Sequence, residues 1–412
     1  MTLRAVLVAT LALICGPALA ASSAARSVPD YLKTAPLVFY VARGATDACG
    51  PGCDSWIAVE GRIDGDAAGR FRKFLRPLRD RHLPMYFNSP GGDLDQALAM
   101  GAVLRETPVI ARVARTVVME CGFEAQDSDA CLKLKRSGRE LHADLRTFAA
   151  ICNSACPYLI LGAATREVAP EALLGVHSSK VLLRFSGFGR PSEQMIAASM
   201  ARGRDRADRL LSGYFAKMGA DSGLLDLART VRFEDVHFLT REEIVRFGID
   251  RREFVETSWA FENNPRSMAR KSSIARNGAD NSYRLVQLRL YCFNADQFEL
   301  DFQSHGSTSV SIVPTIRISN EGSVSSYFRP SPTTSQGFQI WGLLMNRASA
   351  LALAEKPQFD VTETSQGLDG RRLVHSTKFS TEGLAGALAR LIETCPPSVN
   401  SVLRQSSNSA AK

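Results

Sequence analysis

The sequence lacks the features that mark several large classes of protein. Beyond the first 20 residues, no stretch reaches the roughly 18 consecutive apolar residues that a transmembrane helix needs. There is no Lys/Arg run and no interleaving of basic with aromatic residues, so we expect no nucleic-acid partner. The ATP-binding signature G-x4-G-K-[ST] is absent. The six histidines are not clustered, and we expect neither a metal nor another cofactor.

The positive charge excess is small. Lys and Arg number 50 and Asp and Glu 42, a formal net charge of +8 that is scattered along the chain. It supports only a weak attraction to anionic membrane surfaces or acidic partners. The chain has 412 residues, of which 45% are hydrophobic. At roughly 100–200 residues per domain, this length predicts two folded domains.

The first 20 residues have the pattern of a secretory signal peptide. Arg4 precedes the apolar run Ala5–Cys15, and an A-x-A cleavage pattern ends at Ala20. A membrane anchor is the alternative, but the run is too short to cross about 30 Å. A lipoprotein is disfavoured because Ile14 stands before Cys15, where a small residue is needed. We therefore expect cleavage near Ala20 and a periplasmic or secreted protein.

The cysteines fit an oxidising compartment. Of the nine cysteines, only Cys15 lies in the predicted signal peptide, which leaves an even number in the mature chain. Such a set is typical of a disulfide framework, whose connectivity the sequence leaves open. Local proximity favours the pairs Cys49–Cys53, Cys121–Cys131 and Cys152–Cys156. Cys292 and Cys395 are the only cysteines of the C-terminal region, so we expect them to tie its ends together. A zinc site is the alternative, but the spacing is C-x3-C and no histidines cluster nearby.

The pattern of apolar residues divides the mature chain into two regions. Residues 30–255 alternate strand and helix signals, which predicts an α/β domain with a mostly parallel sheet. Residues 256–281 show no clear periodicity and are interpreted as a linker. Residues 282–397 contain several strand-like runs and then one amphipathic helix, which predicts a β-rich domain closed by that helix. The polar residues 398–412 are expected to be a disordered tail.

Three segments of the first domain carry residues suited to chemistry. In Asn88-Ser89-Pro90-Gly91-Gly92, between a strand and a helix, the glycines expose backbone N–H groups that can bind an oxyanion. Ser154, between Cys152 and Cys156, stands at a predicted helix start, where a nucleophile is favoured. His177 ends an apolar strand 23 residues later and can act as a base. The alternatives are an ordinary turn, a helix cap and a structural histidine.

Together, in this order, the three segments resemble the proteolytic subunit of Clp protease, in the Clp-protease and crotonase-like superfamily. The resemblance is greatest to the exported Clp-protease-like proteins of Gram-negative bacteria that act without an ATPase, and it covers about residues 35–250. It implies a ββα spiral core, an oxyanion hole from Gly91 or Gly92 with Ala155, Ser154 as the nucleophile and His177 as the general base. It also implies assembly into a homo-oligomer, a trimer or a hexamer.

The third member of the triad departs from that family's pattern. The family has an aspartate two residues before a Phe-Leu-Ser/Thr segment, which here is Phe238-Leu239-Thr240. That position holds Val236, and Asp235 stands one residue earlier. Asp235 is therefore the candidate for the acid, and a Ser-His dyad or an inactive site is the alternative.

Two functions follow from the resemblance. One is an exported serine peptidase that acts on peptides or unfolded protein segments. The other is a catalytically inactive protein of the same fold that binds peptides or partner proteins. The retained Ser154 and His177 favour the first, whereas the shifted acid and the additional β-rich domain favour the second.

Overall fold

The computed structural model describes residues 36–181, 183, 191–263, 266–276, 282–305, 310–319, 326–329, 332–335 and 337–397. The predicted signal peptide and the polar tail 398–412 lie outside the described residues. Within the described ranges, no helix is both long enough and apolar enough to cross a membrane.

The first region is built around a seven-stranded sheet with the order β5-β6-β1-β2-β3-β4-β8. Strand β1 pairs in parallel with β6, and β2, β3, β4 and β8 form a continuous parallel set, as the alternating pattern predicted. The β1–β2 and β5–β6 pairs are antiparallel. The strands are β1 (Val38–Arg43), β2 (Ser55–Glu60), β3 (Met85–Asn88), β4 (Ile110–Val113), β5 (Arg115–Val118), β6 (Leu141–Arg146) and β8 (Thr165–Glu167).

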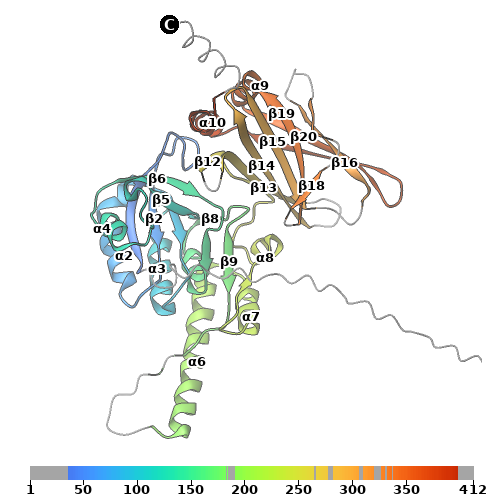
Figure 1. Ribbon diagram of the computed structural model, residues 1–412. Helices are drawn as coiled ribbons and strands as arrows, with labels where there is room; N and C mark the ends of the chain where they lie inside the picture. The colour runs from blue at the N-terminus through green and yellow to red at the C-terminus, as the bar shows by residue number, and fades with distance from the viewer. Residues whose placement is uncertain are drawn as a thin grey trace, which may run out of the picture.

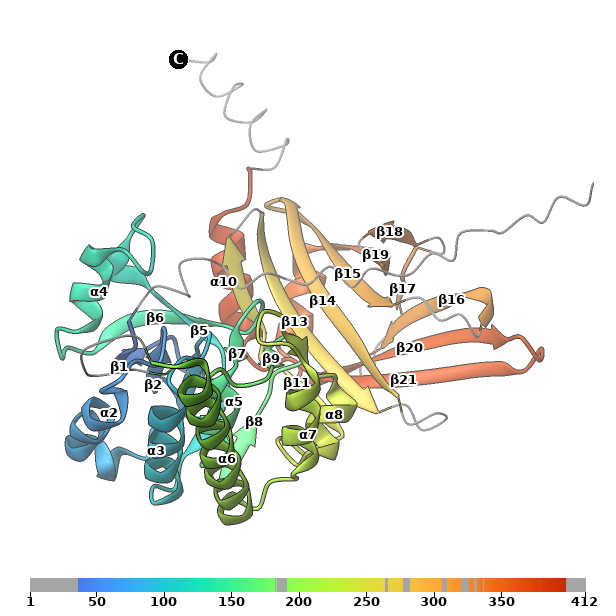
Figure 2. The ribbon, with the colours of Figure 1, turned by 90° about the horizontal axis from the view of Figure 1, so that it is seen from below.

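Helices α2 and α3 cover one face of this sheet, and the short α4 packs on the other (Figures 1 and 2). Phe71 of α2 and Met100 of α3 pack with Met85 and Phe87 of β3 in the largest apolar core. Helix α6 also reaches this core, but only through its last two turns, and the rest of it extends away from the body (Figure 1). The helical elements are α2 (Ala67–Leu75), η1 (Arg76–Arg81), α3 (Leu94–Arg105), η2 (Met119–Cys121), α4 (Asp129–Lys135), α5 (Ala155–Ile160), α6 (Glu193–Met218), α7 (Gly223–Thr230) and α8 (Arg241–Arg246).

A second, three-stranded sheet carries the residues predicted to act chemically. Strand β9 (Leu173–Val176) lies between β7 (Ile151–Asn153), to which it is parallel, and β10 (His237–Phe238), to which it is antiparallel. A bridge between Ser89 and Cys152 joins the turn after β3 to β7. The glycine turn and the small sheet are therefore held together by backbone hydrogen bonds.

The second region consists of two antiparallel sheets with an apolar core between them. One sheet has the order β11-β13-β14-β15-β19-β18 with β12 paired to β13, and the other has the order β17-β16-β20-β21. Their core contains Phe302 and Trp341 from one sheet, Phe359 and Phe379 from the other, and Leu388 of α10. The elements are β11 (Phe254–Glu256), β12 (Ala260–Asn263), β13 (Ser267–Arg276), β14 (Tyr283–Asn294), β15 (Gln297–His305), β16 (Val310–Ser319), β17 (Ser326–Tyr327), β18 (Thr333–Ser335), β19 (Phe338–Asn346), α9 (Arg347–Ala354), β20 (Gln358–Gly367), β21 (Arg372–Ser380) and α10 (Leu384–Glu393).

The interpretation of residues 256–281 as a linker is wrong. This segment contains β12 and β13, and β13 is an interior strand that pairs with β11, β12 and β14. Its polar run Lys271-Ser272-Ser273 is buried. Two interactions compensate for this burial: Lys271 forms an ion pair with Glu256 at 3.1 Å, and the Ser272 N–H donates to the Thr257 hydroxyl at 3.0 Å. The β-rich unit therefore includes residues that lack an apolar periodicity.

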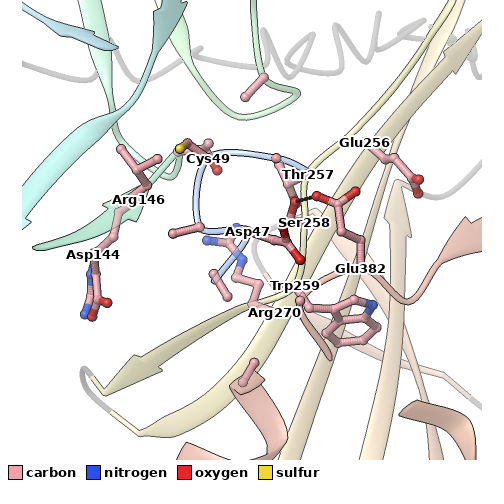
Figure 3. Close-up of a pocket in the computed structure, with 18 of the residues that line it drawn as sticks. Asp47, Cys49, Asp144, Arg146, Glu256, Thr257, Ser258, Trp259, Arg270 and Glu382 are labelled. Atoms are coloured by element: carbon pink, nitrogen blue, oxygen red, sulfur yellow. Dashed lines mark hydrogen bonds between the residues drawn. The ribbon is translucent and has the colours of Figure 1, made fainter. Parts of the chain in front are cut away.

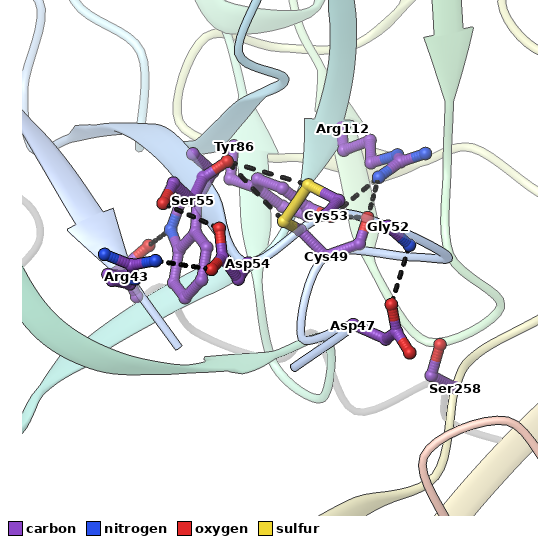
Figure 4. The surroundings of a disulfide bond; sticks show 12 residues. Arg43, Asp47, Cys49, Gly52, Cys53, Asp54, Ser55, Tyr86, Arg112 and Ser258 are labelled. Atoms are coloured by element: carbon purple, nitrogen blue, oxygen red, sulfur yellow. Dashed lines mark hydrogen bonds and ion pairs between the residues drawn. A yellow bond between two sulfur atoms is a disulfide. The ribbon is translucent and has the colours of Figure 1, made fainter. Parts of the chain in front are cut away.

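All four predicted disulfides are confirmed: Cys49–Cys53, Cys121–Cys131, Cys152–Cys156 and Cys292–Cys395. Figure 4 shows the first of them, which closes a short loop beside Tyr86 and Arg112. The bond between Cys292 and Cys395 ties β14 to the end of α10. Four disulfides fit a protein exported to an oxidising compartment.

The two regions contact each other through charged and polar groups. Both terminal nitrogens of Arg390, on α10, donate to the Asp144 carboxylate on β6, at 3.0 and 3.1 Å. Arg270 of β13 forms a buried ion pair with Glu171, which also accepts from the Gln287 amide at 2.6 Å. Burial raises the pKa of Glu171, although the positive charge of Arg270 opposes the shift.

Candidate active site

Ser154 occupies a strained turn between a strand and a helix. Strand β7 ends at Asn153 and α5 begins at Ala155, and Ser154 between them has φ 59° and ψ −110°. Residues other than glycine rarely adopt a positive φ, and such strain is concentrated at functional sites. Ser154 stands at the N-cap position, but its side chain makes no capping hydrogen bond. The helix-cap interpretation is therefore wrong, and the half-buried hydroxyl is not used by the helix.

Two features hold this turn in place. The Ser154 N–H donates to the Gly175 carbonyl of β9 at 2.7 Å. The Cys152–Cys156 disulfide links the residues on either side of the turn, and both cysteines are fully buried. A strained backbone persists where its surroundings fix it, so the strand pairing and the disulfide together account for the conformation.

The glycine turn lies directly against Ser154. A Cβ on Gly91, whose φ is +91°, would overlap the Asn153 carbonyl oxygen and lie 2.6 Å from Ser154 Cβ and 2.8 Å from the Ala155 nitrogen. The Gly91 N–H is occupied, since it donates to Ser89 Oγ at 3.1 Å. Within the described residues, no acceptor is paired with the N–H groups of Gly92 and Ala155. Of the predicted donors, these two remain available for an oxyanion. Gly91, which has no side chain, instead allows the glycine turn to lie close to Ser154.

His177 follows the end of β9, as Ser154 follows the end of the neighbouring β7. Asn153 is the register partner of Gly175, so both side chains stand just beyond the carboxyl ends of adjacent parallel strands. The His177 Nδ1 lies 2.8 Å from the Ser178 carbonyl oxygen. Because a carbonyl only accepts, Nδ1 carries a proton, and Nε2 of the neutral ring is left as the basic nitrogen. Phe233 packs edge-on against the imidazole, with the ring centres 5.0 Å apart. No hydrogen bond joins the Ser154 hydroxyl to His177, both of which are described residues.

Asp235 does not complete a triad with His177. Its side chain is 61% exposed and pairs with Arg232 at 3.6 Å, and the proton on His177 Nδ1 goes to a backbone carbonyl instead. Asp235 lies in the bend before β10, not in a strand, and its carboxylate is exposed. Val236, one residue later, lies against β9: its Cγ1 would be 2.5 Å from a Cβ on Gly175, two residues before His177.

Three buried polar side chains around the site were not singled out from the sequence. Ser89 Oγ donates to the Gly61 carbonyl at 2.7 Å while accepting from Gly91, and Asn88 Oδ1 accepts from the Ile151 N–H at 3.1 Å. Both therefore fasten the glycine turn to its neighbours. The side-chain amide of Asn153, beside Ser154, is buried with neither its nitrogen nor its oxygen paired within the described residues. The Asn88-Ser89 pair before Pro-Gly-Gly is the sequence signal that could have indicated this role.

Replacing Gly91 with alanine is expected to lower the reactivity of Ser154 by about 10²-fold or more, because losing an aligned oxyanion donor has an effect of this size. The new Cβ would displace Ser154 and the Ala155 N–H. The measurement is the rate of covalent labelling by a fluorophosphonate. Gly69→Ala is the matched control, since Gly69 is exposed on α2 with nothing within 4 Å of its added Cβ. Labelling of Gly91→Ala at the parent rate would contradict this account.

Comparison with known proteins leaves the family open. No protein-family model matches the chain, and no curated protein matches it. Among solved structures, invasion associated protein B from Bartonella henselae is 12% identical, with a TM-score of 0.25, over 34% of this chain and 92% of that one. A mutant of the 1510-N membrane-bound stomatin-specific protease is 15% identical, with a TM-score of 0.27, over 46% and 73%. A second mutant of that protease, in complex with a substrate peptide, is 15% identical, with a TM-score of 0.25, over 47% and 71%.

Proposed function

We propose that this protein is an exported serine hydrolase with a Clp-protease-like ββα spiral core, which cleaves peptides or unfolded protein segments without ATP. The observation that carries the proposal is the turn at Ser154. A serine with positive φ, set between a strand and a helix and with its hydroxyl left uncapped, is the arrangement that presents a nucleophile. The available N–H groups of Gly92 and Ala155 add to it. The four disulfides support the exported location.

The proposed mechanism is acyl transfer. The Ser154 Oγ attacks the carbonyl carbon of the scissile bond while His177 Nε2 takes the hydroxyl proton. The N–H groups of Gly92 and Ala155 hold the oxyanion of the tetrahedral intermediate. His177 then gives its proton to the leaving amine, and a water molecule, activated by the same nitrogen, releases the acyl group from Ser154.

The proposed site is a dyad, with a backbone carbonyl in place of the acid. The Ser178 carbonyl orients the imidazole and fixes its tautomer. It carries no full negative charge, so it stabilises the imidazolium less than a carboxylate does. The predicted homo-oligomer, a trimer or a hexamer, and the weak membrane attraction stay predictions.

One observation favours the second candidate, a catalytically inactive peptide- or partner-binding protein. The position at which the resemblance expects the acid holds Val236, which packs against β9 beside Gly175. A protein that had lost the acid could keep the fold for binding alone.

Labelling with a fluorophosphonate distinguishes the two functions. The purified, oxidised mature protein is expected to be labelled stoichiometrically, Ser154→Ala not at all, and Ser212→Ala like the parent, because Ser212 is exposed on α6. Circular dichroism of each variant controls for folding. Absence of labelling in the folded, oxidised parent would exclude an activated serine and leave the binding function.

A further inference from the structure

A cavity of about 680 Å³ lies between the two regions of the chain, and none of the proposed catalytic residues lines it. One wall comes from the first region, through residues 45–51 and 144–147. The other comes from the second region, through residues 255–262 and 381–387. Figure 3 shows side chains from both regions converging on this space. Ligand sites are commonly found at such junctions and have volumes of roughly 300–1,000 Å³.

Most charged side chains around the cavity already have a partner of opposite charge. Three lining residues, all described, form no ion pair: Arg146, Asp47 and Glu382. Among the described residues, the cavity therefore offers one guanidinium and two carboxylates without a direct ion-pair partner, although Lys271 lies close enough to Glu382 for their charges to attract. The paired lining residues are Asp144 with Arg390, Glu167 with Arg112 and Arg252, Glu171 and Glu262 with Arg270, and Glu256 with Lys271.

Arg146 marks the anion-binding end of the cavity. It is the last residue of β6, and among the described residues its guanidinium has no ion-pair partner. The planar fork of N–H donors on a guanidinium matches a carboxylate group.

The two carboxylates mark a cation-binding end. Asp47 Oδ1 accepts from the Gly52 N–H at 2.6 Å, and Glu382 Oε1 accepts from the Ser258 hydroxyl at 2.7 Å. Among the residues that the structure describes, the second oxygen of each carboxylate has no hydrogen-bond partner. Figures 3 and 4 both draw Asp47 beside Ser258, and Figure 3 draws Arg146 on the opposite side of the cavity from Glu382. An ammonium group placed near Ser258 would face both acids.

We propose that this cavity binds a short peptide with free ends, its carboxylate on Arg146 and its ammonium group between Asp47 and Glu382. The volume exceeds what one small amino acid fills, and the apolar side chains of Leu145 and Val255 in the lining can contact those of a peptide. The two ends of the peptide therefore contact opposite regions of the chain, the first region through Arg146 and the second through Glu382. The inference does not depend on Ser154 being a nucleophile.

The test is calorimetric titration of the full mature chain carrying Ser154→Ala, so that hydrolysis cannot consume the probe. The probes are the tripeptide Ala-Leu-Ala, its N-acetyl form and its C-terminal amide, together with tripeptides carrying Phe, Glu or Lys in the middle. The free tripeptide is expected to bind, and each cap is expected to weaken binding about tenfold or more, because each removes a hydrogen bond to a charged group.

Variants assign the two ends. Arg146→Gln is expected to weaken binding of the free peptide about tenfold or more but to leave binding of the amide-capped peptide unaffected. Glu382→Gln is expected to weaken binding of the free peptide about tenfold or more but to leave binding of the N-acetyl peptide unaffected. Arg139→Gln is the matched control, because Arg139 is exposed, lies outside the cavity and changes the net charge equally.

Folding is controlled by the melting temperature of each variant, and Arg146→Lys should recover part of the affinity. No binding of any tripeptide at about 5 mM, the weak end of measurable affinity, would overturn the proposal. So would binding that is insensitive to both caps and to Arg146→Gln. Neither result bears on the fluorophosphonate experiment, so the two proposals fail separately.

Discussion

Changing His177 to glutamine is expected to slow the labelling of Ser154 by a fluorophosphonate about 10²–10⁴-fold, the usual contribution of a general base. Glutamine keeps the polarity of the position but cannot take the hydroxyl proton. Asp235→Asn is expected to keep the parent rate within about twofold, because its exposed carboxylate makes no hydrogen bond with His177. Hydrolysis of an unfolded protein substrate provides a second readout.

The matched control is His142→Gln, since His142 is 78% exposed and pairs with Glu120 on the surface. Val236→Asp supplies the opposite test. Val236 stands where the resemblance expects the acid, and its side chain packs against β9 beside Gly175. Removing the acid lowers turnover of a serine triad by about 10⁴-fold, so adding one here is expected to raise the labelling rate at least about tenfold. A strong loss in Asp235→Asn, or no loss in His177→Gln, would contradict the proposed dyad.

Replacing Asp250 with asparagine is expected to destabilise the fold by about 3–5 kcal/mol, the effect of leaving a buried charge without its partner. The Asp250 side chain is 1% exposed and pairs with buried Arg241 at 3.1 Å and with Arg252 at 2.6 Å. It also accepts from the Val168 N–H at 2.8 Å, so it ties the end of the first region to the segment that follows β8. The measurement is the urea midpoint of the oxidised protein.

The pH dependence of the same variant gives an independent check. Burial alone would raise the pKa of Asp250, but the hydrogen bonds from Arg252 and Arg241 outweigh it and lower the pKa to about 2. The pKa of an aspartate in the unfolded chain is about 3.9, so the carboxylate contributes roughly 2–3 kcal/mol to the free energy of unfolding above pH 4. This contribution is lost as the pH falls toward 2, and the stability of Asp250→Asn should not show that decrease. Asp226→Asn is the control, since the Asp226 side chain is 70% exposed. An equal urea midpoint for the two variants would contradict the stabilising role of the Asp250 carboxylate.

The parts of the fold that follow from local sequence were predictable. The strand-turn-helix segments around Gly91 and Ser154 have the expected elements, because short-range patterns of glycine, serine and apolar residues determine them. Three disulfides join cysteines within ten residues of each other, and the fourth joins the only pair left.

The failures have a physical origin in long-range contacts. Lys271 and its polar neighbours look like a linker in the sequence, and their burial depends on the carboxylate of Glu256 and the hydroxyl of Thr257, both outside β13. Asp235 was chosen by proximity in sequence, but it lies in an exposed bend before β10 and pairs there with Arg232. The cavity could not be predicted, since its lining residues are scattered from position 45 to position 390.

The pairing of Asp144 with Arg390 has a consequence for biosynthesis. The two residues are 246 positions apart, and α10, which carries Arg390, is the last helix of the described chain. While the chain is being made, the first region can fold around its own core, but its wall of the cavity stays open until α10 has been synthesised and docked. The cavity is therefore completed only after α10 has been synthesised and has docked against β6.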